Sequence, residues 1–340
     1  MTIVTSLRGS VLAFAVAACA SPPAGTPTVL LVPGKSIEVV GLRRWSIAMI
    51  QDSLTKYAPG ITLDSHACAA ALRYQLGFAD AAVTAYELPG DTVERIVVVV
   101  VEPQDSARVR HRIAPMDTVA PRAEWAPLLR VISESPGPFQ VSLWQYRAWR
   151  GGDLTKLRSL PGTDSSAVLS VWRFLAAHQS RADKAAALST VLADPNYRNR
   201  MAAVALLSNF TDDDQVLHAL LRAQLEADGP VGAMASMVLS SFAQTSSRPV
   251  DWAPVAPELR QMLRGTALFH LTGTMRLLAA TGVDSSLAVP LLRDGGEMLL
   301  AFAAAESADL RNSAHRLLVA LRGKDLGHDS NAWANWVRAL

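Results

Sequence analysis

The side chains that most often perform catalysis or bind metal ions are sparse in this sequence of 340 residues. Its seven histidines form neither a His-Glu-x-x-His motif nor a His-x-His pair, and no Gly-x-Ser-x-Gly motif presents a serine nucleophile. His66 and Cys68 would need further metal ligands that the sequence does not indicate. The sequence therefore predicts no catalytic residue, no metal site and no cofactor, and we expect a protein that is not an enzyme.

A run of three aspartates, residues 212–214, is the densest group of acidic side chains. It lacks the alternating ligands and the terminal glutamate of a calcium-binding loop. It precedes a helical pattern, and aspartate is a favoured residue where a helix begins. We therefore interpret this run as a helix cap.

The overall charge is nearly balanced, with 32 Lys and Arg against 30 Asp and Glu. A nucleic-acid-binding protein needs a dense basic face, so we expect no nucleic-acid partner. A local exception is the basic segment 108–112, Arg-Val-Arg-His-Arg. This segment either contacts anionic lipid headgroups or forms a solvated end of a strand or linker.

The first eighteen residues have the features of a signal peptide. Arg8 is their only charge, and an apolar run of eight residues, 11–18, follows it. The run is too short to span a membrane, which takes about 20 apolar residues. Both features are typical of a cleaved bacterial signal peptide.

The sequence Val16-Ala17-Ala18-Cys19 resembles a lipobox, the recognition sequence of bacterial lipoprotein signal peptidase. The resemblance implies cleavage before Cys19, lipidation of Cys19 and attachment to a membrane of the cell envelope. Two alternatives remain: cleavage after Ala20, which yields a secreted or periplasmic protein, or a misassigned start. Residues 19–34 are rich in Ser, Pro and Gly and are expected to form a flexible tether. Under either cleavage Cys68 is left alone, as a buried apolar residue.

Residues 35–105 are predicted to form a small α+β domain in the order β-α-α-β-β. Strands are expected at 37–41, 78–87 and 95–102, and the last of these is a continuous β-branched run typical of a strand buried on both faces. Two helices are expected between the first two strands. Ser46 or Arg44 lies near the start of the first helix, and Asp64 is the expected N-cap of the second.

This order, with Ile37-x-Val39-x-Gly41, the pair Gly77-Phe78 and the final Val101-Glu102, resembles a POTRA domain. POTRA domains are small modules of outer-membrane assembly proteins and of some division proteins. The resemblance implies peptide capture by pairing with an edge strand. The alternative is a scaffold of the same topology without a peptide site.

Residues 106–124 are predicted to be a linker, and residues 125–340 an all-α array. Helices are expected at 125–134 and 139–149, separated by Pro-Gly-Pro. Trp144, Tyr146 and Trp149 form an aromatic patch that we interpret as core or domain-interface packing, with a binding surface as the alternative.

The array contains an internal repeat. Similar apolar segments recur around Leu175, Leu207, Leu239, Leu278 and Leu318, at spacings of 32, 32, 39 and 40 residues. Such periods, each with two short helices, are typical of α-solenoids, in which neighbouring helix pairs stack to bury their apolar faces. The pattern resembles HEAT-type repeats. Residues 323–336 look like an ending common after HEAT-like repeats in exported bacterial proteins, with Asp329 or Ser330 as a cap and Trp333 and Trp336 closing the open end.

The sequence as a whole predicts an exported, lipid-anchored, non-enzymatic scaffold that binds protein partners through its helical surface. One alternative is an envelope assembly or division factor that binds peptides by strand addition to the POTRA-like domain; it requires an uncovered outer strand. The other is an enzyme with a site in the interdomain cleft near His66, Arg44 and the aromatic patch. This last alternative requires a deep pocket with converging polar groups.

Overall fold

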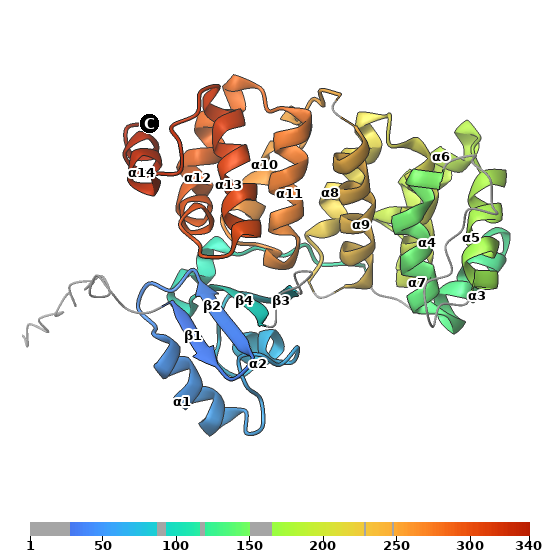
Figure 1. Ribbon diagram of the computed structural model, residues 1–340. Coiled ribbons are helices and arrows are strands. Elements are labelled where there is room, and N and C mark those ends of the chain that lie inside the picture. The colour runs from blue at the N-terminus through green and yellow to red at the C-terminus, as the bar shows by residue number, and fades with distance from the viewer. Residues whose placement is uncertain (1–27, 87–92, 116–119, 150–164, 228, 247) are drawn as a thin grey trace, which may run out of the picture.

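A computed structural model describes residues 28–86, 93–115, 120–149, 165–227, 229–246 and 248–340. A small mixed β-sheet with two helices is followed by a long array of helices, as the sequence predicted (Figure 1). The leader, Cys19 and most of the expected tether lie outside the described residues. No helix in the part of the chain that the structure describes is long and apolar enough to cross a membrane.

The sheet contains four strands in the order β1-β2-β4-β3. Strand β2 runs parallel to β4, whereas β1 is antiparallel to β2 and β3 is antiparallel to β4. The strand bounds are β1 Val29–Val32, β2 Lys35–Val40, β3 Asp80–Tyr86 and β4 Glu94–Val101. The three predicted strands and the central place of the valine-rich strand are therefore confirmed.

Strand β1 corrects the expected tether, because it lies inside residues 19–34. It pairs with β2 through a tight turn in which Gly34 takes a positive φ of 74°. Prolines flank the segment Val-Leu-Leu-Val on both sides, and this composition suggested a disordered tether. Pairing with β2 nevertheless makes this segment a strand. Residues 19–27 of the expected tether lie outside the described residues, so the prediction for them stays a prediction.

The helices of the small domain both cover one face of the sheet. Helix α1 spans Ile47–Tyr57, and the Ser46 side chain caps it by accepting a hydrogen bond from the Met49 N–H. Helix α2 spans Cys68–Tyr74 and begins four residues later than Asp64, the predicted cap. Asp64 instead lies 2.7 Å from the Lys35 ammonium group, and this hydrogen bond lowers the pKa of Asp64.

The array consists of two rows of stacked helices (Figure 1). Helices α7, α9, α11 and α13 pack side by side in one row, called here the second-helix row, and α6, α8, α10 and α12 lie in the other. The bounds are α3 Ala126–Glu134, α4 Pro136–Trp149, α5 Ser165–Ala177, α6 Arg181–Val191, α7 Tyr197–Leu207, α8 Asp214–Gln224, α9 Pro230–Thr245, α10 Ala256–Leu263, α11 Leu268–Thr281, α12 Ser285–Ala303, α13 Ala308–Arg322 and α14 Ser330–Arg338.

The helix boundaries follow the capping signals in the sequence. Asp213 is the N-cap of α8 and accepts a hydrogen bond from the Gln215 N–H, and Asp329 caps α14 in the same way. Helix α4 already begins at Pro136, so the expected Pro-Gly-Pro break lies in its first turn, where proline is tolerated. Helix α14 covers the last helices of the array with a buried Trp333 and a half-buried Trp336.

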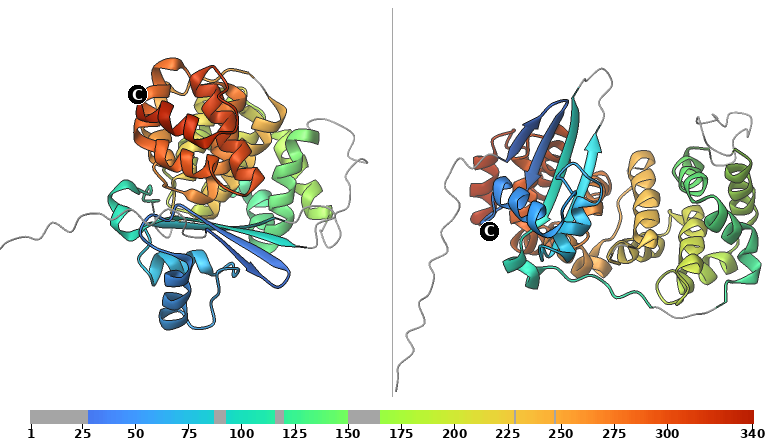
Figure 2. Two further views of the ribbon diagram at one scale, coloured as in Figure 1. Left: turned by 60° about the vertical axis from the view of Figure 1, so that its left-hand side comes forward. Right: turned by 90° about the horizontal axis from the view of Figure 1, so that it is seen from below.

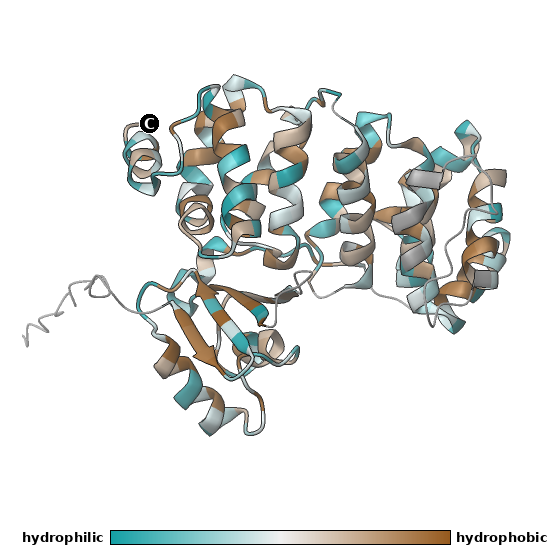
Figure 3. Ribbon diagram, viewed as in Figure 1, coloured by the Kyte–Doolittle hydropathy of each residue, from teal (hydrophilic) through white to brown (hydrophobic). Residues whose placement is uncertain are grey.

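Strand β4 joins the two parts of the molecule because both of its faces are buried. Ile96, Val98 and Val100 pack with α1 and α2, whereas Val97 and Val99 belong to the core of the helical array. The strands of the sheet are accordingly largely brown in Figure 3. The sheet therefore lies between its own two helices and the ends of the array helices, at the half of the array formed by α10–α13 (Figure 2).

The expected linker, residues 106–124, lies against the array over the part that the structure describes. Its first described part runs from β4 along one side of the array, and its last described residues lead into α3 (Figure 2). The N–H groups of Arg110 and Arg112 donate to Thr266 Oγ1 and to the Leu225 carbonyl oxygen. The described residues of this linker, 106–115 and 120–124, are therefore docked on the array, and we call them the strap.

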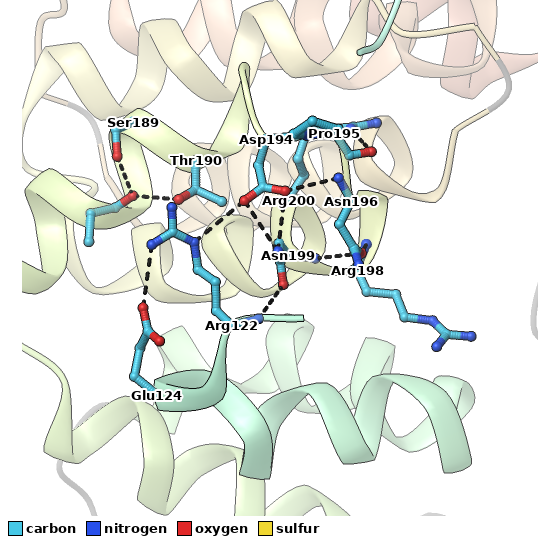
Figure 4. Close-up of polar contacts among 11 residues, drawn as sticks. Arg122, Glu124, Ser189, Thr190, Asp194, Pro195, Asn196, Arg198, Asn199 and Arg200 are labelled. Atoms are coloured by element: carbon cyan, nitrogen blue, oxygen red, sulfur yellow. Dashed lines mark hydrogen bonds and ion pairs between the residues drawn. The ribbon is translucent and has the colours of Figure 1, made fainter. Parts of the chain in front are cut away.

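A polar network anchors the end of this strap to the α6–α7 loop (Figure 4). The Arg122 N–H donates to Asn199 Oδ1 at 3.1 Å, and the Arg122 guanidinium lies 3.5 Å from Asp194. Asn199 in turn donates to both oxygens of Asp194. The end of the strap therefore contacts the array at the α6–α7 loop and the first turn of α7.

Candidate functional site

A cavity of about 510 Å³ lies where β3, α2, the strap and the array meet, and we call it the junction cavity. Six titratable side chains from five separate segments line it: His66 and Arg73 from around α2, Asp80 from β3, His111 from the strap, Glu226 from the end of α8 and His270 from α11. Its volume falls within the usual range of small-molecule pockets, about 300–1,000 Å³.

Asp80 is the most buried polar side chain that comes from the sheet side of the cavity, with 2% of its surface exposed. Its carboxylate accepts hydrogen bonds from the N–H groups of Ala81 at 2.8 Å and of Leu268, the first residue of α11, at 3.2 Å. The His111 Nε2 atom lies 3.5 Å away. Burial raises the pKa of Asp80 and outweighs the opposing effects of His111 and of these amides.

Glu226 lines the cavity from the array side, and each of its two carboxylate oxygens is paired with an arginine. Its two carboxylate oxygens lie 2.6 Å from Arg112 Nη1 and 3.3 Å from Arg200 Nη2. Three of the four basic side chains of segment 108–112 have internal contacts: Arg108 pairs with Glu297, His111 lies beside Asp80, and Arg112 pairs with Glu226. The Arg110 side chain is exposed.

His270 lies in the first turn of α11 with 7% of its surface exposed. Burial, together with the nearby His111, lowers the pKa of His270 to about 4. No described residue forms a hydrogen bond with the Nδ1 atoms of His270 and His111, and both atoms are buried. The cavity therefore combines satisfied carboxylates with two imidazole nitrogens that lack a partner.

We expect the burial of His270 to make the protein less stable in mild acid. The unfolded chain binds a proton at His270 near pH 6.5, whereas the folded chain binds it only near pH 4. The unfolded state therefore takes up more protons in this interval, and the stability falls as the pH decreases through it, by about 3 kcal/mol for a shift of this size. Asp80 has a raised pKa and therefore acts in the opposite direction.

Urea unfolding at several pH values between 4 and 7 tests this expectation for the full chain, with His270→Gln as the variant. The variant should lose less stability on acidification than the native chain. His66→Gln, at an exposed position of the same cavity, is the matched control and should keep the native pH dependence. An unchanged pH dependence in His270→Gln would show that His270 does not carry the effect.

The second-helix row carries a separate groove of about 730 Å³ across α9, α11 and α13. Half of its lining residues are small: Ser240, Ala243, Gly273, Ala279, Ala280 and Ala320. Two arginines, Arg276 and Arg316, also line the groove. Arg276 forms an ion pair with Asp309 and donates to Ser313 Oγ at 3.0 Å. Arg316 is exposed and forms no ion pair or hydrogen bond with any residue that the structure describes.

The structure brings together only some of the residues expected near an interdomain site. His66 lines the junction cavity, but Arg44 does not; its backbone N–H donates instead to the buried Glu102 carboxylate. Tyr146 is buried in α4, where its hydroxyl group donates to Asn209 Oδ1, so this member of the aromatic patch packs in the core as interpreted. The side chains of Trp144 and Trp149 lie outside the described residues.

Cys68 lies in the core between the sheet and helices α1 and α2, whereas His66 lines the junction cavity. It is fully buried, as predicted, and burial raises the pKa of its thiol to about 12. Within the described ranges, no group of three His, Cys, Asp or Glu side chains is arranged to hold a metal ion. No local sequence pattern indicates the junction cavity, because Asp80 obtains its partner, the Leu268 N–H, from 188 positions away.

Comparison of the chain with protein-family models, with curated proteins and with solved structures finds no match in any of the three.

Proposed function

We propose that this protein is an exported, non-enzymatic scaffold that binds a protein partner in the groove of the second-helix row. We further propose that the lipobox-like sequence directs lipidation of Cys19 and so holds the scaffold at a membrane of the cell envelope. The single observation that carries the binding proposal is the groove itself: three neighbouring helices present small side chains and one unpaired cation, Arg316.

The assignment of the array to HEAT-like repeats is part of this proposal. The five leucines that marked the repeat lie in α5, α7, α9, α11 and α13, that is, in every second helix, and all five are buried. Repeats stacked in this way form extended surfaces along one row of helices, which suits the binding of a segment of another protein.

The groove favours a partner segment with acidic side chains. The small residues on three neighbouring helices let a partner backbone approach the helices closely between the longer side chains of the lining. Gly273 shows how close the helices are, since a Cβ atom there would lie 3.1 Å from Ser240 Oγ. Arg316 supplies an exposed guanidinium group, which recognises carboxylates with two parallel hydrogen bonds.

Site-specific photocrosslinking in cells that express the full chain tests the proposal. A photoreactive residue at position 280, inside the groove, should form an adduct with one dominant partner, and a residue at the exposed position 253 should not. Arg316→Glu should remove most of the adduct at position 280. Arg130→Glu, an exposed arginine on α3, is the matched control and should leave it unchanged. Adducts of equal yield at both positions, or adducts insensitive to Arg316→Glu, would refute the groove as the binding surface.

A second candidate function, peptide capture by strand addition, is favoured by one observation. Among the described residues, β1 forms an edge of the sheet, and its Leu31 is 77% exposed. The other edge strand, β3, packs on α11. The POTRA-like interpretation is supported by the parallel β2–β4 and antiparallel β4–β3 pairs with both helices on one face. In the same experiment, a dominant adduct at position 31 and none at position 280 would favour this candidate.

A further inference from the structure

Strand β1 leaves one edge of the sheet without a partner among the described residues. It is the outermost strand in the order β1-β2-β4-β3, whereas β3 at the other edge packs on α11 (Figure 1). The strand contains only apolar residues, Val-Leu-Leu-Val, and Leu31 is 77% exposed. An exposed edge strand presents unpaired N–H and C=O groups that pair readily with a further strand. What this edge can bind therefore depends on where these groups lie.

The hydrogen bonds between β1 and β2 determine which backbone groups point outward. The Val39 N–H donates to the Thr28 carbonyl oxygen at 2.7 Å, so these two residues form a hydrogen-bonded pair. In an antiparallel ladder such pairs alternate with pairs that exchange no hydrogen bond. Leu30 therefore bonds to β2, whereas the N–H and C=O groups of Val29 and Leu31 point away from it. Within the described ranges, no backbone group bonds to these outward groups.

Proline limits the length of this edge. Pro33 follows Leu31 at the next outward position, and Pro27 precedes Val29 by the same interval in the sequence. Proline has no N–H group and cannot donate to a ladder. Val29 and Leu31 are therefore the residues of the edge that both donate and accept, and they lie symmetrically about Leu30.

This symmetry makes the edge complementary to itself. When two copies of β1 run antiparallel with Leu30 opposite Leu30, Val29 of each copy faces Leu31 of the other. Each outward N–H then meets an outward C=O, and each of these apolar side chains has an apolar neighbour across the ladder. Shifting the register so that outward residues still face each other places Val29 or Leu31 opposite a proline, which leaves a carbonyl oxygen without a donor.

Charge does not oppose this pairing. Strand β1 has no charged residue, and Lys35, the first charged residue after it, is held by Asp64 at 2.7 Å and by Glu94 at 3.3 Å. We propose that two copies of this protein associate through β1, so that their sheets join across a two-fold axis. This inference goes beyond the proposed function and does not depend on the groove of the second-helix row, which α9, α11 and α13 form.

The short strand determines the strength of the association. A strand of four residues covers much less than the roughly 1,600 Å² of a standard stable interface. We therefore expect a reversible dimer with a dissociation constant of about 10–100 µM. Because a two-fold contact uses the β1 edge of both copies, association stops at the dimer.

Sedimentation equilibrium of the full chain at about 1–500 µM tests the proposal and should show a monomer that converts to a dimer. Amide exchange measured by NMR should be fast at Val29 and Leu31 in the dilute chain and slow in the concentrated one, and slow at Leu30 in both. Leu31→Pro removes an outward N–H but no bond between β1 and β2. It should weaken association at least about tenfold, with a native circular dichroism spectrum, because the dimer loses two hydrogen bonds. Leu31→Lys keeps the backbone intact and should also weaken association.

Ile113→Lys is the matched control, because Ile113 is an equally prominent apolar side chain, 92% exposed, on the strap. It should associate as the native chain does, and so should Arg316→Glu, which alters the groove. The proposal is overturned if the chain stays monomeric over the whole range, if both Leu31 variants associate normally, or if Ile113→Lys weakens association as much as they do. Protection of the Val29 and Leu31 amides in the dilute monomer would also overturn it, because another segment of the same chain would then cover the edge. A photoadduct of position 31 with a different protein, and none with a second copy, would replace it with peptide capture.

Discussion

Replacing Gly295 with alanine should lower the free energy of unfolding by about 3 kcal/mol, at the upper end of the usual cost of overpacking a core. Gly295 lies in α12 where this helix crosses α10. A Cβ atom at this position would overlap the Cβ atom of Leu263 and would lie 2.9 Å from the carbonyl carbon and oxygen of the same residue. Because a backbone segment blocks the methyl group, α10 and α12 must move apart to admit it.

The neighbouring glycine provides a matched control. A Cβ atom at Gly296 would meet only Val337 Cγ1, at 2.7 Å, and the end of a side chain can rotate away. Alanine is also favoured over glycine inside a helix by about 1 kcal/mol. Urea unfolding followed by circular dichroism should therefore show Gly296→Ala within about 1 kcal/mol of the native chain. Equal losses in the two variants would contradict the close approach of α10 and α12.

Replacing Glu38 with alanine should have a similarly large effect, about 3 kcal/mol, because its carboxylate joins the sheet to the array. Glu38 lies in β2 and is 5% exposed. Its two oxygens accept hydrogen bonds from the N–H groups of Glu306 at 2.6 Å and Ser307 at 2.8 Å, immediately before α13. The substitution leaves both N–H groups without their acceptor at a helix N-terminus, where a negative charge is stabilising.

Urea unfolding and amide hydrogen exchange measure this effect. In Glu38→Ala the amide of Ser307 should exchange markedly faster than in the native chain. Glu297→Ala is the control, because the Glu297 side chain is 64% exposed and its pairs with Arg43 and Arg108 should contribute less than about 1 kcal/mol. If Glu38→Ala retains native stability and slow exchange at Ser307, the carboxylate does not hold the two parts together.

The sequence predicted those parts of the fold that depend on local patterns. The valine run of β4 and the Ser46, Asp213 and Asp329 caps are all short-range signals, and the structure contains each of them. Two predictions about the small domain were wrong because the local sequence pattern was misleading. Flanking prolines concealed β1, and Asp64 resembled a cap although its partner is Lys35, 29 residues away in the chain.

The junction cavity could not be predicted because its contacts join very distant residues. Asp80 accepts a hydrogen bond from the N–H of Leu268, 188 positions later, and Glu226 pairs with Arg112, 114 positions earlier. No periodicity relates such pairs. His66 was singled out by residue type alone, whereas Arg73, Asp80 and His270 gain their significance only from the docking of the sheet onto α11.

The double burial of β4 has a consequence for the synthesis of this protein. The sheet is translated first and can assemble with α1 and α2, but Val97 and Val99 then face water until the helices around α11 exist, some 170 residues later. A chain whose last contacts are this distant folds slowly and exposes apolar surface on the way. During translation, and during any transport across a membrane, the nascent protein therefore presents a valine-lined face that a chaperone is well placed to shield.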